Sequence, residues 1–293
     1  MEFDGVSPGA LDEVEVPGGR LRIARFGSGP RLIVAVHGIT ASLMSWRAIG
    51  EALPPEWTLV AMDLRGRGHS AGVPGPYGLD AHAADVERVA EHVGAGETAV
   101  LAGHSMGAYV AALHAPDRAY ERVVLIDGGL PMPLPPDVDV DAVLEAGLGP
   151  AIARLDQTFA DVTAYVDFFK AHPALTEWAP AIEDYVRYDA VETPDGVRSR
   201  VRADAVRVDG RWLLTGSAAV GDALKRTTAP IRLIRAPRGL LNQPVGMIPN
   251  DVAAAWTAQL PTLEDELLDD CNHYTMVFDP RCVRRVVERL TVA

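Results

Sequence analysis

The 293-residue sequence has few lysines, few cysteines and no long uncharged stretch. Only Lys170 and Lys225 are lysines, and 40 acidic residues against 27 basic ones give a net charge of −13. Nucleic acid and anionic membranes repel such a chain, so neither is expected as a partner. No run approaches the length of a membrane span, and the first residues, 1–6, lack the basic start and apolar core of a secretory signal. We therefore expect a cytoplasmic protein.

Cysteine is almost absent. Cys271 and Cys282 could pair in principle, but a chain that is not exported keeps its thiols reduced, so no disulfide is expected. The His, Cys and Asp residues form no cluster with metal-ligand spacing, and no G-x-G-x-x-G follows an expected strand. The sequence thus indicates no metal and no nucleotide, and we expect no cofactor.

The most informative stretch is 100–110, where an apolar run stops at Gly103–Gly107 (GHSMG) and resumes as a helix pattern of small residues. This pattern predicts a strand, a tight turn and a helix, with Ser105 at the apex. A G-x-S-x-G turn strains the serine backbone and presents its hydroxyl clear of the sheet, which suits a nucleophile. The alternative is a glycine-rich turn with an incidental serine, and the flanking strand and helix patterns favour the nucleophile.

Around this turn, apolar runs alternate with helix patterns. Residues 11–26 have the alternation of a β-hairpin, and buried strands are expected at 32–36, 58–62, 98–102, 122–126, 231–235 and 263–268. Helices are expected at 42–53, 80–93, 249–260 and 283–290 and directly after Ser105. The sequence predicts an α/β fold with a mostly parallel sheet of about eight strands and helices on both faces.

Four stretches together resemble the α/β-hydrolase superfamily over nearly the whole chain. They are the strand end His37-Gly38, the turn Asp63–Ser70 (DLRGRGHS), the Gly103–Gly107 turn and the late Asn272–Tyr274 (NHY). The resemblance implies that residues 130–228, which begin with the proline-rich stretch 131–136 and continue in helix patterns, form an inserted helical lid. Residues 1–129 and 229–293 are then the hydrolase core. The Asp63–Ser70 turn itself is interpreted as structural.

The resemblance also implies the catalytic layout. His273 is the candidate base for Ser105, and the backbone N–H groups of Ile39 and Met106 are the candidate oxyanion donors. His37 is expected to fix the oxyanion loop by hydrogen bonding. His104, beside the nucleophile, is expected to have a packing role.

The acid of the triad has two candidate positions. Most of the superfamily places it after the seventh strand, where this chain has Asn242, and an amide cannot stabilise an imidazolium. Some relatives, including haloalkane dehalogenases, take the acid from the end of the sixth strand, where this chain has Asp127. We predict Asp127, with Asn242 as a weakened alternative third member and Asp269 or Asp270 as further possibilities.

Aromatic and apolar side chains of the lid form its own small core, and some are expected to line a substrate pocket between lid and sheet. The candidates are Met132, Leu134, Phe159, Phe168, Trp178 and Tyr188. Such a lining favours an apolar or aromatic substrate.

These features predict a serine hydrolase, a monomer or homodimer, that cleaves a small-molecule carboxylic ester or lactone through an acyl-enzyme. A carbon–carbon bond hydrolase, a thioesterase or acyltransferase, and a cofactor-free perhydrolase use the same triad and stay open. Haloalkane dehalogenases and epoxide hydrolases are disfavoured, because those relatives have an aspartate where this chain has Ser105. The alternative outside enzymes is a ligand-binding receptor that kept the fold and lost turnover, which Asn242 would explain.

Overall fold

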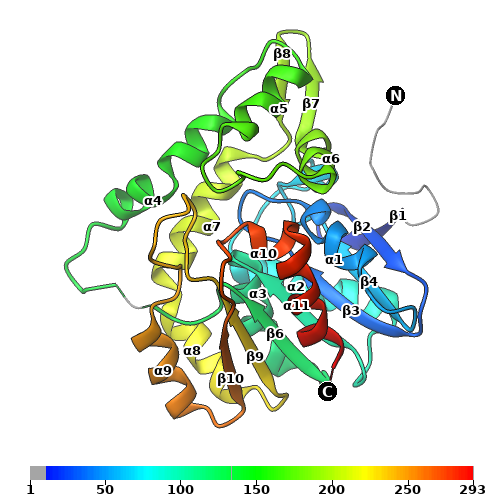
Figure 1. Ribbon diagram of the computed structural model, residues 1–293, viewed down its shortest axis with the longest axis vertical. Helices are drawn as coiled ribbons and strands as arrows, with labels where there is room; N and C mark the ends of the chain where they lie inside the picture. The colour runs from blue at the N-terminus through cyan, green and yellow to red at the C-terminus, as the bar shows by residue number, and fades with distance from the viewer. Residues whose placement is uncertain (1–10, 133, 293) are drawn as a thin grey trace.

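The computed structural model (Figure 1) describes residues 11–132 and 134–292. At its centre is an eight-stranded sheet with the order β1-β2-β4-β3-β5-β6-β9-β10. The strands are β1 (Leu11–Val16), β2 (Gly19–Gly27), β3 (Arg31–Val36), β4 (Trp57–Met62), β5 (Val100–His104), β6 (Arg122–Ile126), β9 (Ile231–Arg235) and β10 (Leu263–Leu267). β2 pairs antiparallel with β1 and with β4, and all the other pairs are parallel. The predicted α/β fold with a mostly parallel sheet is confirmed.

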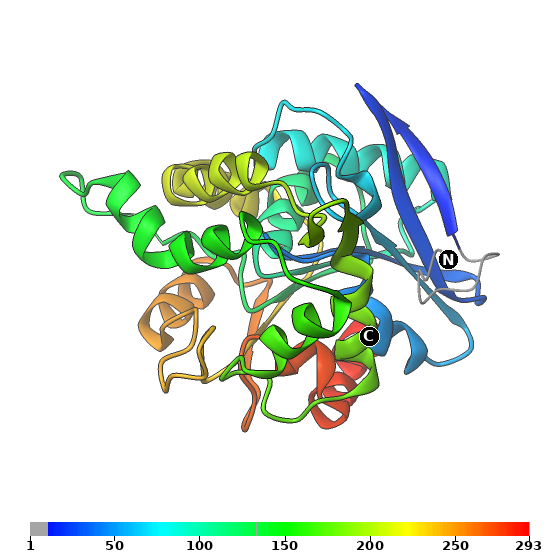
Figure 2. The same ribbon diagram turned by 90° about the horizontal axis from the view of Figure 1, so that it is seen from above.

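The apolar strands form two cores because successive side chains point to opposite faces of a strand. On β3, Val34 and Val36 belong to one buried cluster, while Ile33 and Ala35 belong to the other. Two layers of helices cover these clusters (Figure 2). The first contains α2 (Leu79–Val93), α3 (Met106–His114), α8 (Ser217–Arg226) and α9 (Asn250–Gln259), and the second α1 (Arg47–Glu51), α10 (Thr275–Phe278) and α11 (Pro280–Thr291).

Three predicted elements differ from the observed ones by more than one residue, and one of them is the helix expected at 283–290, which runs from Pro280 to Thr291 as α11. The helix expected at 42–53 consists of a 3₁₀ turn, Leu43–Trp46, followed by the short helix α1. The strand expected at 98–102 runs from Val100 to His104, because Gly103 and His104 still pair with β6.

Residues 130–228, called the insert below, connect β6 to β9. The insert contains α4 (Val140–Leu155), α5 (Val162–Lys170), α6 (Pro180–Asp189), β7 (Ala190–Thr193), β8 (Gly196–Ser199), α7 (Ala203–Thr215) and α8. Figure 1 shows α5, α6 and the β7–β8 hairpin together above the sheet, and Figure 2 shows α4 extending away from the side that carries β1 and β2. Pro133, in the proline-rich stretch 131–136, lies outside the described residues.

The insert is not purely helical, because β7 and β8 form a two-stranded antiparallel sheet. Its turn contains Pro194, Asp195 and Gly196, and Gly196 has a φ of +129°. The sequence Pro-Asp-Gly is a turn signal, and it was not used when the whole segment was interpreted as helical. At the C-terminal end of the insert, α8 packs against α3. Its residues Val220, Ala223 and Leu224 belong to the buried cluster that also contains Val34 and Val36 of β3. The division into core and lid at residue 228 stays a prediction.

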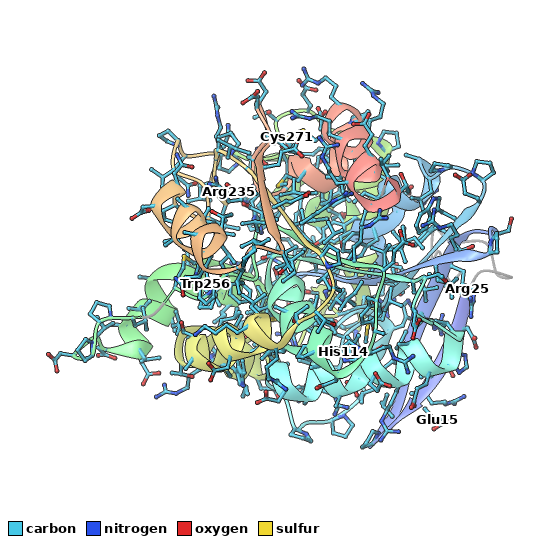
Figure 3. The ribbon with its side chains drawn as sticks, turned by 90° about the horizontal axis from the view of Figure 1, so that it is seen from below. Glu15, Arg25, His114, Arg235, Trp256 and Cys271 are labelled. Atoms are coloured by element: carbon cyan, nitrogen blue, oxygen red, sulfur yellow. A yellow bond between two sulfur atoms is a disulfide. The ribbon has the colours of Figure 1, made fainter. Side chains whose placement is uncertain are left out.

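The expectation of reduced thiols is wrong for this structure, in which Cys271 and Cys282 form a disulfide. Cys271, labelled in Figure 3, follows β10, and Cys282 lies in the first turn of α11. The end of the sheet and the start of the last helix bring their α carbons to 6.7 Å. The bridge closes a short loop that contains His273. Within the described residues, no helix has the length and apolar character needed to cross a bilayer.

Replacing both cysteines by serine removes this cross-link from the unfolded chain. We expect the double variant Cys271→Ser/Cys282→Ser to lose roughly 2–4 kcal/mol of stability, measured by thermal or urea unfolding. A reductant should lower the melting temperature of the wild type to that of the variant and leave the variant unchanged. Two titratable thiols in the unfolded, unreduced wild type would contradict the disulfide.

Candidate active site

Ser105 stands between β5, which ends at His104, and α3, which begins at Met106. Its backbone has φ 56° and ψ −124°, a conformation that costs about 1–3 kcal/mol for a residue other than glycine. The Ser105 N–H donates to Ile126 O at 2.8 Å, so the turn stays attached to β6. The side chain is partly exposed. The predicted strand, tight turn and helix are all present, with Ser105 at the apex.

The glycines of this turn permit direct contact between backbones. A β carbon on Gly103 would lie 2.1 Å from Gly107 O, and one on Gly107 would lie 2.1 Å from Val36 O. No side chain fits at either position. The glycines therefore hold β5, α3 and the end of β3 close together around Ser105.

Asp127 and His273 are hydrogen-bonded. Asp127 follows β6 with a φ of 47°, and its Oδ2 lies 2.7 Å from His273 Nδ1. Its Oδ1 accepts a hydrogen bond from Ala236 N at 3.1 Å, next to the end of β9. Both side chains are buried. Because the carboxylate accepts from Nδ1–H, the neutral ring has its free lone pair on Nε2, the form that a general base needs.

The loop that carries His273 is fixed by its own backbone. His273 N donates to Arg238 O at 3.1 Å, and His104 Nε2 donates to His273 O at 3.0 Å. The rings of His104 and His273 pack with centroids 4.7 Å apart. Burial lowers the pKa of His104 well below its ordinary value, so this ring is a neutral spacer. His104 thus packs on His273 itself, which links the residue before Ser105 to the histidine loop.

Within residues 11–132 and 134–292, Ser105 Oγ makes no hydrogen bond to the His273 ring. In ligand-free enzymes this contact is often long and shortens when substrate binds. The structure therefore brings together Asp127 and His273 directly, and Ser105 through its neighbour His104.

The loop after β3 passes beside the serine. A β carbon on Gly38 would lie 3.2 Å from Ser105 Cβ and 3.5 Å from Ser105 Oγ. His37 Nδ1 donates to Gly38 O at 2.7 Å, and His37 Nε2 accepts from Leu64 N at 3.0 Å. Burial lowers the pKa of His37 to about 3, so the ring stays neutral. In agreement with the prediction for His37, hydrogen bonds from its ring fix this loop.

These contacts orient the candidate oxyanion donors. In a trans peptide the C=O and N–H point in opposite directions, so a Gly38 C=O held by His37 directs the Ile39 N–H away from that ring. Within the described residues, the Ile39 N–H donates to no protein acceptor. Met106 is the first residue of α3, where N–H groups lack a partner in the helix and the helix dipole favours negative charge.

The alternative third member, Asn242, has a different partner. Its Oδ1 accepts from Asn272 Nδ2 at 3.3 Å, and that same Nδ2 also donates to Ala174 O at 3.0 Å. Asn272 Oδ1 in turn accepts from the N–H groups of Tyr274 and Thr275. Asn242 thus supports the turn that precedes α10, while Asp127 contacts the histidine.

The predicted lid residues make mostly structural contacts. Phe159 packs edge-on against Tyr165 and Phe168, with centroids 5.0 and 5.4 Å away, and Trp178 Nε1 donates to Glu183 at 3.3 Å. Met132 and Phe168 are exposed, and Leu134 is half-buried. Two other rings form a series of contacts that starts at the candidate base. The Tyr274 ring packs on the His273 ring, with centroids 5.5 Å apart, and the His172 ring packs on Tyr274. Neither His172 nor Tyr274 is among the predicted site residues, although Tyr274 directly follows His273.

Tyr188 is buried against the Asp63–Ser70 turn. Asp63 accepts hydrogen bonds from Leu43 N at 2.8 Å, His69 N at 2.9 Å and Tyr188 OH at 2.6 Å. Burial raises the pKa of Asp63 to about 6, although these hydrogen bonds oppose the shift. Asp63 therefore connects the turn to α6 of the insert.

Comparison with known proteins identifies the family of this chain. Residues 33–289 match the model of the Alpha/beta hydrolase family. The chain is 24% identical to the soluble epoxide hydrolase of Corynebacterium sp., covering 92% of both chains, and 26% identical to the pimeloyl-[acyl-carrier protein] methyl ester esterase of Vibrio campbellii, covering 85% of this chain and 89% of that one. Several other curated relatives match over less than half of their own length.

Among solved structures, E-2-(acetamidomethylene)succinate hydrolase superposes with a TM-score of 0.79 at 22% identity, covering 97% of this chain and 99% of that one. The fold and the family match together define the class: the chain belongs to the alpha/beta hydrolase family.

The raised pKa of Asp63 predicts a pH dependence of stability. The folded chain holds this proton more tightly than the unfolded chain, whose pKa is near 3.8. The stabilisation is present below pH 4 and is lost as the pH rises to about 6. Relative to Asp63→Asn, the wild type should lose roughly 2–2.5 kcal/mol between pH 4 and pH 7, measured by urea unfolding. If the difference in unfolding free energy between the wild type and Asp63→Asn did not vary with pH, the raised pKa of Asp63 would be refuted.

Proposed function

We propose that this chain is a serine hydrolase that cleaves a carboxylic ester or lactone through an acyl-enzyme on Ser105. The observation that carries the proposal is the 2.7 Å hydrogen bond between Asp127 and His273. It leaves Nε2 of the ring free to act as a base for Ser105, the strained, partly exposed serine after β5. A serine hydroxyl is a weak nucleophile without such a base.

The proposed reaction has two halves. His273 Nε2 takes the hydroxyl proton as Ser105 Oγ attacks the substrate carbonyl carbon, and the N–H groups of Ile39 and Met106 stabilise the oxyanion. The carbonyl re-forms, the bond to the alcohol oxygen breaks, and His273 returns the proton to that oxygen. Water then attacks the acyl-enzyme by the same proton transfers, releasing the acid and restoring Ser105.

Asp127 has two tasks in this scheme. Its carboxylate holds the ring in the productive tautomer, and its negative charge stabilises the imidazolium that forms in each half-reaction. Because Asp127 is buried and is itself held by Ala236 N, the ring cannot turn without breaking this contact. The contact supports the Asp127 assignment and leaves Asn242 to a structural role.

The residue types and one relative support an ester over the alternatives. Epoxide hydrolases, one of which is similar to this chain, are expected to have an aspartate nucleophile, and Ser105 stands at that position. Carbon–carbon bond hydrolases, thioesterases and perhydrolases share the proposed triad, so they stay as alternatives, and similarity to a methyl ester esterase favours the ester. A receptor without turnover is the remaining candidate, and its only basis was Asn242.

The substrate that we propose is a small molecule with an apolar or aromatic part. Residues 130–228 would act as a lid over it, and aromatic residues of the insert would exclude water during the reaction. No cofactor takes part in the proposed reaction.

A fluorophosphonate probe tests the nucleophile. We expect the wild type to be labelled stoichiometrically on Ser105, Ser105→Ala to remain unlabelled, and His273→Ala to react much more slowly because the hydroxyl has lost its base. Mass spectrometry of the labelled peptide gives the site. A folded wild type that stays unlabelled would rule out the enzyme and favour the receptor.

A second pair of variants tests the acid. Asp127→Asn should lower kcat on a nitrophenyl ester by roughly 10⁴-fold, since the ring loses both its tautomer and its counter-charge. Asn242→Ala is the matched control and should retain most of its kcat. If only Asn242→Ala lost several orders of magnitude, the roles assigned to the two residues would be reversed.

A further inference from the structure

Two arginines of the Asp63–Ser70 turn are buried, and each has a carboxylate partner. Arg65 binds Asp85 of α2 through two hydrogen bonds of 2.7 Å. Arg67 binds Asp209 of α7, with Nη1 and Oδ2 2.6 Å apart and both side chains fully buried. The first pair lies within the core, whereas the second connects the core to the insert.

Arg67 also holds the candidate oxyanion loop. Its Nε donates to Ile39 O at 2.9 Å, and its Nη1 donates to Arg65 O at 3.1 Å. Because Nε and Nη1 belong to one rigid, planar guanidinium, the position of the Asp209 carboxylate and the position of Ile39 O are linked.

Asp209 is in turn fixed from three directions. Besides Arg67, its Oδ1 accepts from Gly78 N at 2.6 Å, and its Oδ2 lies 2.9 Å from His82 Nε2 of α2. Burial raises the pKa of Asp209, but the hydrogen bond from His82 and the charges of His82 and Arg67 outweigh this and hold the pKa below its usual value. The carboxylate is therefore a fixed anion that positions Arg67.

The insert contacts Ile39 on its side chain as well. Gly210 follows Asp209 in α7, and a β carbon there would lie 3.7 Å from Ile39 Cδ1. Ile39 is thus restrained at three places: His37 holds the preceding carbonyl, Arg67 holds its own carbonyl, and α7 packs on its side chain. Two of these three restraints depend on the insert.

We propose that Arg67 and Asp209 are positioning residues through which the insert sets the direction of the Ile39 N–H toward the oxyanion. This inference rests on the proposed function, in which Ile39 N–H is an oxyanion donor. It implies that the oxyanion site is complete only while α7 is docked on the turn that carries Arg67.

The Arg65–Asp85 pair provides a matched control. Arg65 belongs to the same turn as Arg67, and its pair with Asp85 is almost as deeply buried. Within the described residues, the Arg65 side chain donates to Asp85, Pro74 O and Pro76 O and to no atom of residues 37–39. If both ion pairs only stabilised the fold, substitutions in either pair would affect kcat equally. If Arg67 and Asp209 position Ile39, only substitutions in their pair lower kcat.

The experiment compares Arg67→Lys and Asp209→Asn with Arg65→Lys and Asp85→Asn, on a nitrophenyl ester, at a temperature where all four are folded. Lysine has one ammonium and cannot reach Ile39 O and Asp209 with the geometry of the fork. We expect the Arg67 and Asp209 variants to lose about 10- to 100-fold in kcat with KM nearly unchanged, because the lost interaction acts in the transition state. The two control variants should lower the melting temperature and keep kcat.

Hydrogen exchange of the peptide that covers residues 37–41 gives a readout that does not depend on activity. Exchange in this peptide should rise in the Arg67 and Asp209 variants and stay at the wild-type level in the controls. An unchanged exchange rate together with wild-type kcat, or equal losses in both pairs, would overturn the inference. An inactive, unlabelled wild type whose Arg67 variants still show faster exchange would instead refute the proposed function alone.

Discussion

The whole site depends on close backbone contacts around Ser105. The end of β3 touches the first turn of α3 at Gly107, and a β carbon on Gly128 would lie 2.3 Å from Ser105 O. These contacts hold the serine in a strained conformation with positive φ that the isolated turn would avoid. Because the carboxyl ends of neighbouring parallel strands meet at one edge, the same packing brings the loop after β3, Ser105 and Asp127 to one place.

The parts of the fold that the sequence predicts well are those with local signals. The bounds predicted for β6 are the observed ones, because a short run rich in β-branched residues that ends at Asp127-Gly128-Gly129 is typical of a buried strand. Ser105 was found from a five-residue motif whose glycines are required by steric contacts, and the same contacts are seen in the structure. Asp127 was favoured over Asn242 by residue chemistry, and it is the residue that hydrogen-bonds to His273.

The interactions that the sequence could not predict join residues far apart in the chain. Nothing near Arg67 indicates Asp209 as its partner, and nothing near Tyr188 indicates Asp63, since these pairs form only when the insert packs on the core. The disulfide was misjudged for a related reason. The cell compartment determines only whether free thiols stay reduced, whereas the fold places these two cysteines side by side. The sequence identifies each charged or polar residue, but which residue it pairs with depends on how the folded segments pack.

The position of α8 has a consequence for exchanging parts of this chain with those of its relatives. Although α8 belongs to the segment between β6 and β9, its apolar face is buried on α3 with the side chains that support the nucleophile turn. A chimera that grafts a foreign insert should therefore be joined near Gly216, before α8 begins. A junction at residue 228 would replace part of the scaffold under Ser105 along with the rest of the insert.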